Sequence, residues 1–103
     1  MKFYTQLYVG EGVRHLRSIK RKLKCGWLVK NAYLITFAAG NDLLEIYDAK
    51  VFVQKYYKKF PRMIVGIASD YEEAVELVIK MIEESLNSRG DCNVKAYLEA
   101  NMS

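Results

Sequence analysis

The sequence predicts a small α/β (α+β) domain in which a mixed sheet of four to five strands is flanked by helices. Apolar residues alternate in some segments and recur every third or fourth position in others, so strands and helices follow one another. The chain has 103 residues, 51% of them hydrophobic, which suffices for one core, and no linker or low-complexity tract divides it. We therefore expect a single domain over residues 1–103 with the order β-α-β-β-α-β-α-β.

The first strand is predicted within residues 2–9, where side chains alternate in polarity, and Gly10 and Gly12 end it. The basic stretch 13–25 predicts an amphipathic helix because apolar residues recur at intervals of three and four. Gly26 is a suitable C-terminal cap for this helix. The two faces of the strand are expected to carry Phe3, Thr5, Leu7 and Val9 on one side and Tyr4, Gln6 and Tyr8 on the other.

Two apolar runs, 33–39 and 43–47, are separated by the turn-forming residues 40–42. The Gly-Asn pair between runs rich in β-formers predicts a hairpin. The alternative is one helix over residues 43–60, capped by Asn or Asp of the turn, because the second run also fits a helical face. We favour the hairpin because both runs are rich in strand-forming residues.

Residues 49–60 predict a second helix, which follows Asp48 and ends before Pro61. The continuous apolar run in residues 62–69 is typical of a strand that is covered on both faces or lies at the centre of a sheet. Gly66 within this run indicates that another group packs very close to it.

Asp70 begins the clearest helix of the chain, and Gly90 ends it. Asp70 and Glu73 together resemble a capping box, although that motif strictly takes Ser or Thr at the first position. In the last segment, residues 93–100, apolar and polar residues alternate, which predicts a short final strand. A terminal helical turn is the alternative.

The net charge of +4 is unevenly distributed along the chain. Residues 1–40 carry a net charge of +7, whereas residues 70–103 carry −5. This asymmetry favours either head-to-tail self-association or binding to a polyanion.

The basic helix is the strongest candidate for nucleic-acid binding, because a row of cations on one helix face can follow a line of phosphates. The alternative is the solvated face of an ordinary amphipathic helix, since Lys and Arg are good helix formers. Binding to a membrane surface is a weaker alternative, because the apolar side of this helix is needed for the core. The candidates are Arg14, Arg17, Arg21 and Lys24, joined by Lys55, Lys58 and Lys59 if the fold brings the two basic clusters together.

Gly10, Gly12 and Arg14 form a candidate phosphate site, because a Gly-x-Gly turn before a helix can place amides around an anion. His15 stands where the dinucleotide-binding fingerprint has its third glycine, so this pattern is incomplete. A phosphate or nucleotide sensor is therefore a second alternative function.

Leu77 and Ile79 widen the apolar stripe of the acidic helix beyond what one packed side needs. Tyr57 is the aromatic residue of the second basic cluster that packing does not require. These three residues are the interface candidates of our leading hypothesis, a binding domain that contacts a protein partner or forms a homo-oligomer.

Catalysis is not expected, because no paired carboxylates, activated nucleophile or metal-ligand cluster is recognisable. Cys25, Cys92 and one His cannot complete a zinc site without carboxylates, so we expect no metal and no cofactor. The two distant cysteines are expected to be free thiols in a reducing compartment, with a disulfide between Cys25 and Cys92 as the weaker alternative. Together with the lack of an export signal and of a membrane-spanning apolar run, they predict a cytoplasmic location.

Overall fold

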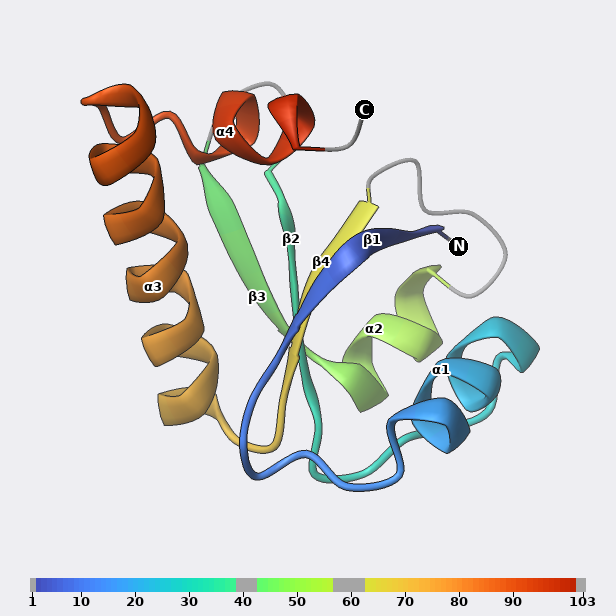
Figure 1. Cartoon of the computed structure of the whole chain (residues 1–103). Coiled ribbons are helices and arrows are strands. Elements are labelled where there is room, and N and C mark those ends of the chain that lie inside the picture. The colour runs from blue at the N-terminus through green and yellow to red at the C-terminus, as the bar shows by residue number, and fades with distance from the viewer. Residues whose placement is uncertain (1, 39–42, 57–62, 102–103) are drawn as a thin grey trace.

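The computed structural model describes residues 2–38, 43–56 and 63–101 (Figure 1). Within them the chain forms a mixed α/β domain with a four-stranded sheet, which confirms the predicted class. The strands are β1 (Lys2–Val9), β2 (Tyr33–Phe37), β3 (Leu44–Asp48) and β4 (Met63–Ala68). The helices are α1 (Leu16–Cys25), α2 (Ala49–Tyr56), α3 (Tyr71–Arg89) and α4 (Val94–Ala100).

The strands lie in the order β1-β4-β2-β3. β1 runs parallel to β4, and β2 runs antiparallel to both of its neighbours, β4 and β3. β2 and β3 pair from Tyr33 with Asp48 to Phe37 with Leu44. This register confirms the hairpin and excludes a helix at residues 44–48, while turn residues 39–42 lie outside the described part.

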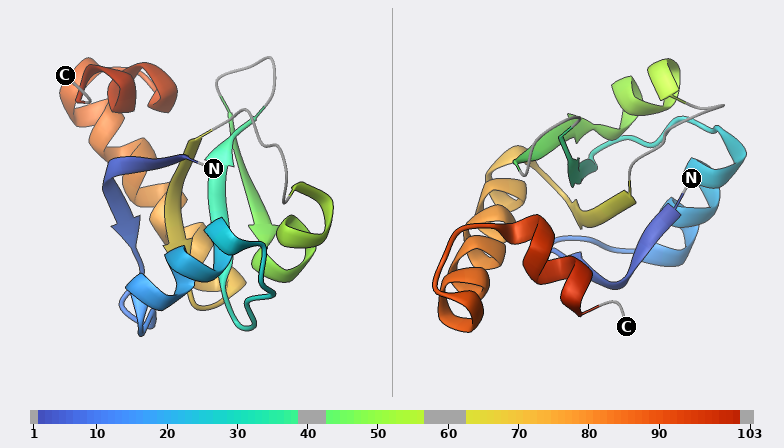
Figure 2. Two further views of the ribbon diagram at one scale, coloured as in Figure 1. Left: turned by 90° about the vertical axis from the view of Figure 1, so that its right-hand side faces the viewer. Right: turned by 90° about the horizontal axis from the view of Figure 1, so that it is seen from above.

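Helices cover both faces of the sheet, α3 and α4 on one side and α1 and α2 on the other (Figures 1 and 2). The alternation of β1 places its side chains in two cores. Tyr4 and Tyr8 pack with the core under α3 and α4, whereas Phe3 and Leu7 pack with the core under α1 and α2. The predicted faces of the first strand are therefore confirmed at these four positions.

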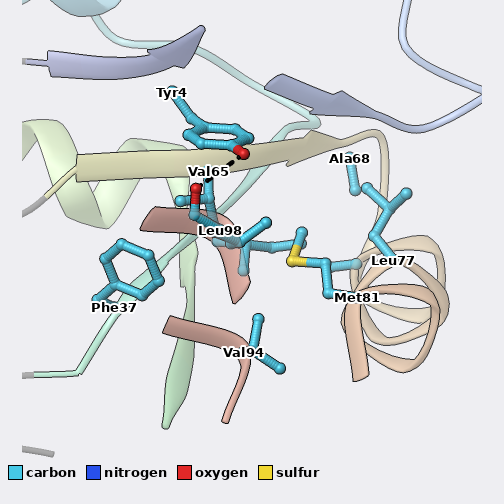
Figure 3. Close-up of a cluster of buried hydrophobic side chains, with 10 residues drawn as sticks. Tyr4, Phe37, Val65, Ala68, Leu77, Met81, Val94 and Leu98 are labelled. Carbon is cyan, nitrogen blue, oxygen red and sulfur yellow. Dashed lines mark hydrogen bonds between the residues drawn. The ribbon is translucent and has the colours of Figure 1, made fainter. Parts of the chain in front are cut away.

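The core under α3 and α4 gathers side chains from the sheet and both helices (Figure 3). Met81 and Leu98 are fully buried there, and the fully buried Val65 of β4 belongs to the same cluster. The hydroxyl of Tyr4 donates a hydrogen bond of 3.1 Å to the carbonyl oxygen of Leu98. Edge strand β1 and helix α4 are thereby joined directly.

The predicted final strand is wrong, because residues 94–100 form helix α4 instead. Asn93 caps this helix by accepting a hydrogen bond from the amide of Ala96 at 3.0 Å. Val94 and Leu98, four residues apart, both point into the core. In so short a segment these two apolar positions fit a helical period as well as an alternating one, so the helical turn that we kept as the alternative is the correct description.

The predicted caps are confirmed at three helix ends. Gly26 and Gly90 end α1 and α3 in the left-handed conformation, with φ of 75° and 80°. Asp70 caps the start of α3 by accepting the amide of Glu73 at 2.8 Å.

α2 follows Asp48, which accepts the amide of Lys50 at 2.9 Å. α2 is described as far as Tyr56, so its predicted continuation to Pro61 lies outside the described residues.

Within the described residues, no helix combines the length and the apolar character that crossing a membrane requires.

Gly66 lies where β4 is packed tightly by one side chain of the neighbouring strand β2 and one of α3. A Cβ atom at this position would lie 2.9 Å from Cδ1 of Ile35 and 3.3 Å from Cε of Met81. Both of these side chains are fully buried. This close contact confirms the prediction that another group packs very close to Gly66.

We expect Gly66→Ala to lower the free energy of unfolding by about 1–3 kcal/mol, because the added methyl group overpacks the core. Ile35→Val removes the nearest clashing carbon and by itself costs about 1 kcal/mol. The double variant should lose less than the sum of the two single losses, as measured by urea denaturation. Additive losses would contradict the contact between these positions.

Candidate functional site

The candidate site begins where β1 and β4 end. These neighbouring parallel strands point their carboxyl ends to the same edge of the sheet. After β1 the chain turns to α1 on one face, and after β4 it turns to α3 on the other (Figure 1). Where neighbouring parallel strands continue to opposite faces, the two connections diverge and leave a crevice, which is the usual place of a ligand site in open α/β sheets.

A carboxylate of the protein occupies part of this crevice. One oxygen of Glu73 accepts the amide of Gly12 at 2.8 Å. The other accepts the amide and the hydroxyl of Ser69 at 2.8 and 3.0 Å. Glu73 therefore ties the turn after β1 to the turn after β4, instead of returning to the amide of Asp70 as a capping box would.

The two glycines of the Gly-x-Gly turn make room for this carboxylate. A Cβ atom on Gly10 would lie 1.9 Å from Oε1 of Glu73, and one on Gly12 would lie 2.3 Å from Oγ of Ser69. The amide of Gly10 donates to the carbonyl oxygen of Ile67 at 2.9 Å. Both amides thus have partners inside the protein, and a phosphate at this turn would compete with Glu73 for the amide of Gly12.

The hydrogen bonds to Glu73 change its acidity. Desolvation, the largest single effect, raises its pKa, but the bonds from the amides of Ser69 and Gly12 and from the Ser69 hydroxyl together outweigh it. The pKa of Glu73 therefore lies below its ordinary value, and the ionised carboxylate is the form that holds the two turns together.

α1 starts later than the basic stretch predicts. The helix begins at Leu16 rather than Val13, because His15 adopts the left-handed conformation with φ of 58°. Arg14 therefore precedes the helix and does not continue the row formed by Arg17, Arg21 and Lys24. The predicted four-residue stripe is thus divided between two surfaces.

The first surface is an open pocket of about 670 Å³ on the α1 side of the crevice. We call it the switch pocket, because it lies where the connections after two neighbouring strands switch to opposite faces of the sheet. It lies between the turn after β1, α1 and the loop after α1. None of the described residues that line it is acidic. Its basic and polar lining includes Arg14, His15, Ser18, Lys22, Lys30 and Asn31.

The second surface, the α1 groove, is a shallower hollow of about 430 Å³ on the other flank of α1. Lys20 and Lys24 lean over the ring of Phe3, with Nζ at 5.1 and 5.6 Å from the ring centroid. The cation–π contacts hold these two lysines beside β1. Its lining residues are Arg17, Lys20, Arg21, Lys24 and Cys25.

The positive charge of α1 is not balanced locally. Residues 12–41 contain no Asp or Glu. Among the described residues, an ion pair joins Nε of Arg89 to Oδ1 of Asp91 at 3.2 Å, at the end of α3 and far from α1. The acidic residues of α3 lie on the opposite face of the sheet (Figure 1). The field of α1 is therefore available to an external anion.

Two large apolar side chains follow the basic helix and were missed as candidates in the sequence. Trp27 and Leu28 are 60% and 49% exposed. The turn at Gly26 places them there, with the amide of Trp27 donating to the carbonyl oxygen of Lys22 at 2.8 Å. In the sequence, the signal that could have identified them is their position directly after Gly26, the glycine that ends the basic helix.

The remaining residues that the sequence singles out lie in different parts of the chain, and some lie outside the described residues. Lys55 is exposed on α2, which shares its face of the sheet with α1 (Figure 1). Lys58, Lys59 and Tyr57 lie outside the described residues. Cys25 and Cys92 are exposed free thiols.

Leu77 and Ile79, the interface candidates on α3, do not share one surface. Leu77 is 9% exposed and belongs to the core under α3 and α4, whereas Ile79 is 49% exposed. Packing against the sheet therefore already explains the apolar character at Leu77, and only Ile79 is available to a partner.

Nothing matched the chain in comparisons with protein-family models, with curated proteins and with solved structures.

We expect the stability contributed by Glu73 to depend on pH. Because the folded-state pKa lies below the ordinary value of 4.5, this contribution is complete above about pH 4.5 and is lost as the pH falls through the folded-state pKa. Glu73→Gln should lower the melting temperature near neutral pH, and its difference from the wild type should shrink near pH 3.

Glu72→Gln is the matched control, since Glu72 is an exposed acid of the same helical turn. This variant should keep the wild-type response to acid. An unchanged melting temperature of Glu73→Gln near neutral pH would show that Glu73 does not hold the two turns together.

Proposed function

We propose that the chain is a nucleic-acid-binding accessory domain that holds a single strand along α1. The observation that carries the proposal is the α1 groove, where four cations line one hollow without an acidic neighbour. The cations are Arg17, Lys20, Arg21 and Lys24.

A row of this kind suits a phosphodiester chain. Arg17 and Arg21 lie one helical turn apart and are both exposed. Arginine presents a planar set of donors that matches phosphate oxygens, and lysine adds a point charge. Such contacts release counterions and do not read sequence, so we expect affinity without strong sequence preference.

Trp27 supports a single strand over a duplex. This residue is 60% exposed and follows the end of the helix that carries the cations. A base of a single strand can stack on such a ring, whereas bases of a duplex are already stacked on one another. Recognition on the sheet itself is not part of the proposal, because helices cover both of its faces (Figure 2).

A membrane surface is the competing anionic partner for the same residues. Insertion of an amphipathic helix needs a free apolar side. In α1, Leu23 is fully buried, and Leu16 and Ile19 pack against the same core. Only Trp27 and Leu28 remain for lipid, so nucleic acid is the better match.

Binding to a protein partner or to a second copy, the leading hypothesis from the sequence, stays a prediction. The exposed side chains of Ile79 and Leu86 on α3 favour it, at 49% and 43% exposure. The absence of an enzymatic role and the cytoplasmic location also stay predictions.

The proposal is tested by fluorescence polarisation with a labelled single strand of mixed sequence. We expect binding in the micromolar range at low salt. Four phosphate contacts predict a slope of about −3 for the logarithm of the association constant against the logarithm of salt concentration. Arg17→Glu/Arg21→Glu should weaken binding more than tenfold and reduce this slope.

Lys80→Glu/Lys95→Glu is the charge-matched control, because both residues lie on the opposite layer, on α3 and α4. This variant should bind much as the wild type does. Equal losses of affinity in the two variants would show that net charge alone causes the effect, which would contradict the proposal. Binding to anionic vesicles but not to the oligonucleotide would identify a membrane surface as the partner, against the proposal.

A further inference from the structure

We propose that the switch pocket binds the phosphate monoester of a nucleotide, either a free mononucleotide or the 5′-terminal nucleotide of a bound strand. The second source rests on the proposed function, and the first does not. This site is separate from the α1 groove, and although Gly12 lines one edge of the pocket, its amide is held by Glu73 and is not part of the proposed site.

The first support is the charge of the pocket. Arg14, Lys22 and Lys30 line it from three segments: the turn before α1, α1 itself and the loop after it. In the described residues none of these three side chains pairs with a carboxylate. A phosphate monoester carries about −1.5 to −2 charges at neutral pH, more than a diester, and therefore gains more from three cations that line one pocket.

The start of α1 adds donors to the same pocket. His15, at the N-cap position, forms no side-chain hydrogen bond to the helix. The first backbone bond into this turn runs from the amide of Ile19 to the carbonyl oxygen of His15, at 3.0 Å. The preceding amides of the first turn thus have no partner within the helix, and they add a positive dipole end beside Arg14.

The remaining lining suits the nucleoside part of the ligand. Val13, Ile19 and Leu28 provide apolar contacts, while Ser18 and Asn31 provide hydrogen-bonding groups. The volume of about 670 Å³ falls within the range of roughly 300–1,000 Å³ that is usual for small-molecule sites. A nucleotide combines the three features that the pocket offers: a strong anion, an apolar ring and polar edges.

Glu73 determines which part of the crevice is open. It holds the amide of Gly12 and both donors of Ser69. Its carboxylate would repel a phosphate placed against the Gly-x-Gly turn. The phosphate is therefore placed on the side of Arg14 and Lys30, away from that turn.

The two basic surfaces lie on opposite flanks of one helix. Lys22 of the pocket and Arg21 of the groove are consecutive, so their side chains point about 100° apart around the helix axis. A strand that crosses α1 from the groove can bring its 5′ end into the pocket.

The experiment uses the full chain and two pairs of probes. Thermal denaturation is followed with adenosine 5′-monophosphate and with adenosine, which lacks the phosphate. Binding is then measured for one oligonucleotide with a 5′-phosphate and with a 5′-hydroxyl. We expect the monophosphate, but not adenosine, to raise the melting temperature. We also expect the 5′-phosphate to strengthen oligonucleotide binding at least about tenfold.

Arg14→Gln and Lys30→Gln should each abolish these phosphate effects, whereas Lys80→Gln on α3, which lines neither basic surface, is the matched control and should retain them. Arg14 and Lys30 are exposed, so the unliganded melting temperature should not change. Stabilisation by the monophosphate without any oligonucleotide binding supports the pocket and overturns the proposed function. Oligonucleotide binding with no effect of either phosphate overturns the pocket and leaves the proposed function standing.

Discussion

The parallel pairing of β1 with β4 is the constraint on which the core and the candidate site both depend. β1 is an edge strand, and its pairing joins Lys2 to Met63 and Val9 to Ile67. The pairing sets the two faces of β1, so that Tyr4 reaches Leu98 of α4 while Phe3 lies under Lys20 of α1. It also brings the turns after β1 and β4 together, and Glu73 then holds them.

The sheet separates two layers of unlike charge. The cations of α1 lie on one face, and the acidic residues of α3 lie on the other (Figures 1 and 2). Exposed charges that lie more than a Debye length apart, about 8–10 Å at physiological salt, are largely screened from each other, so the two layers neutralise each other only weakly. The basic layer keeps its potential, and the hydrogen bonds from Gly12 and Ser69 hold the carboxylate of Glu73 at the turn, so that Glu73 does not line the switch pocket.

The elements with a clear period could be predicted from the sequence. The apolar run around Gly66 and the long stripe of α3 each fitted one kind of element, whereas in the paired runs of the hairpin the strand-forming residues decided between a strand and a helix. The segment after Asn93 was too short to distinguish Val94 and Leu98 as helical neighbours from alternate residues of a strand. At the other end, the start of α1 depends on the left-handed backbone of His15, which its neighbours do not indicate.

The candidate site was less predictable because its contacts are tertiary. The Gly-x-Gly turn did indicate an anion at its amides, but the anion that the amide of Gly12 binds is the carboxylate of Glu73, which comes from a helix far along the chain. Lys30 and Asn31 reach the switch pocket only because Gly26 ends α1 and the chain then turns back. Neither contact leaves a local signal in the sequence.

The pairing of β1 with β4 also has a consequence for how the chain reaches this structure. β2 and β3 are close in sequence and pair as a hairpin, whereas β4, the partner of β1, lies far along the chain. Closing long loops is slow compared with forming local contacts. During synthesis, β1 and the basic helix emerge before β4, and we expect them to dock only once β4 is present, so this strongly charged segment waits longest for its place in the fold.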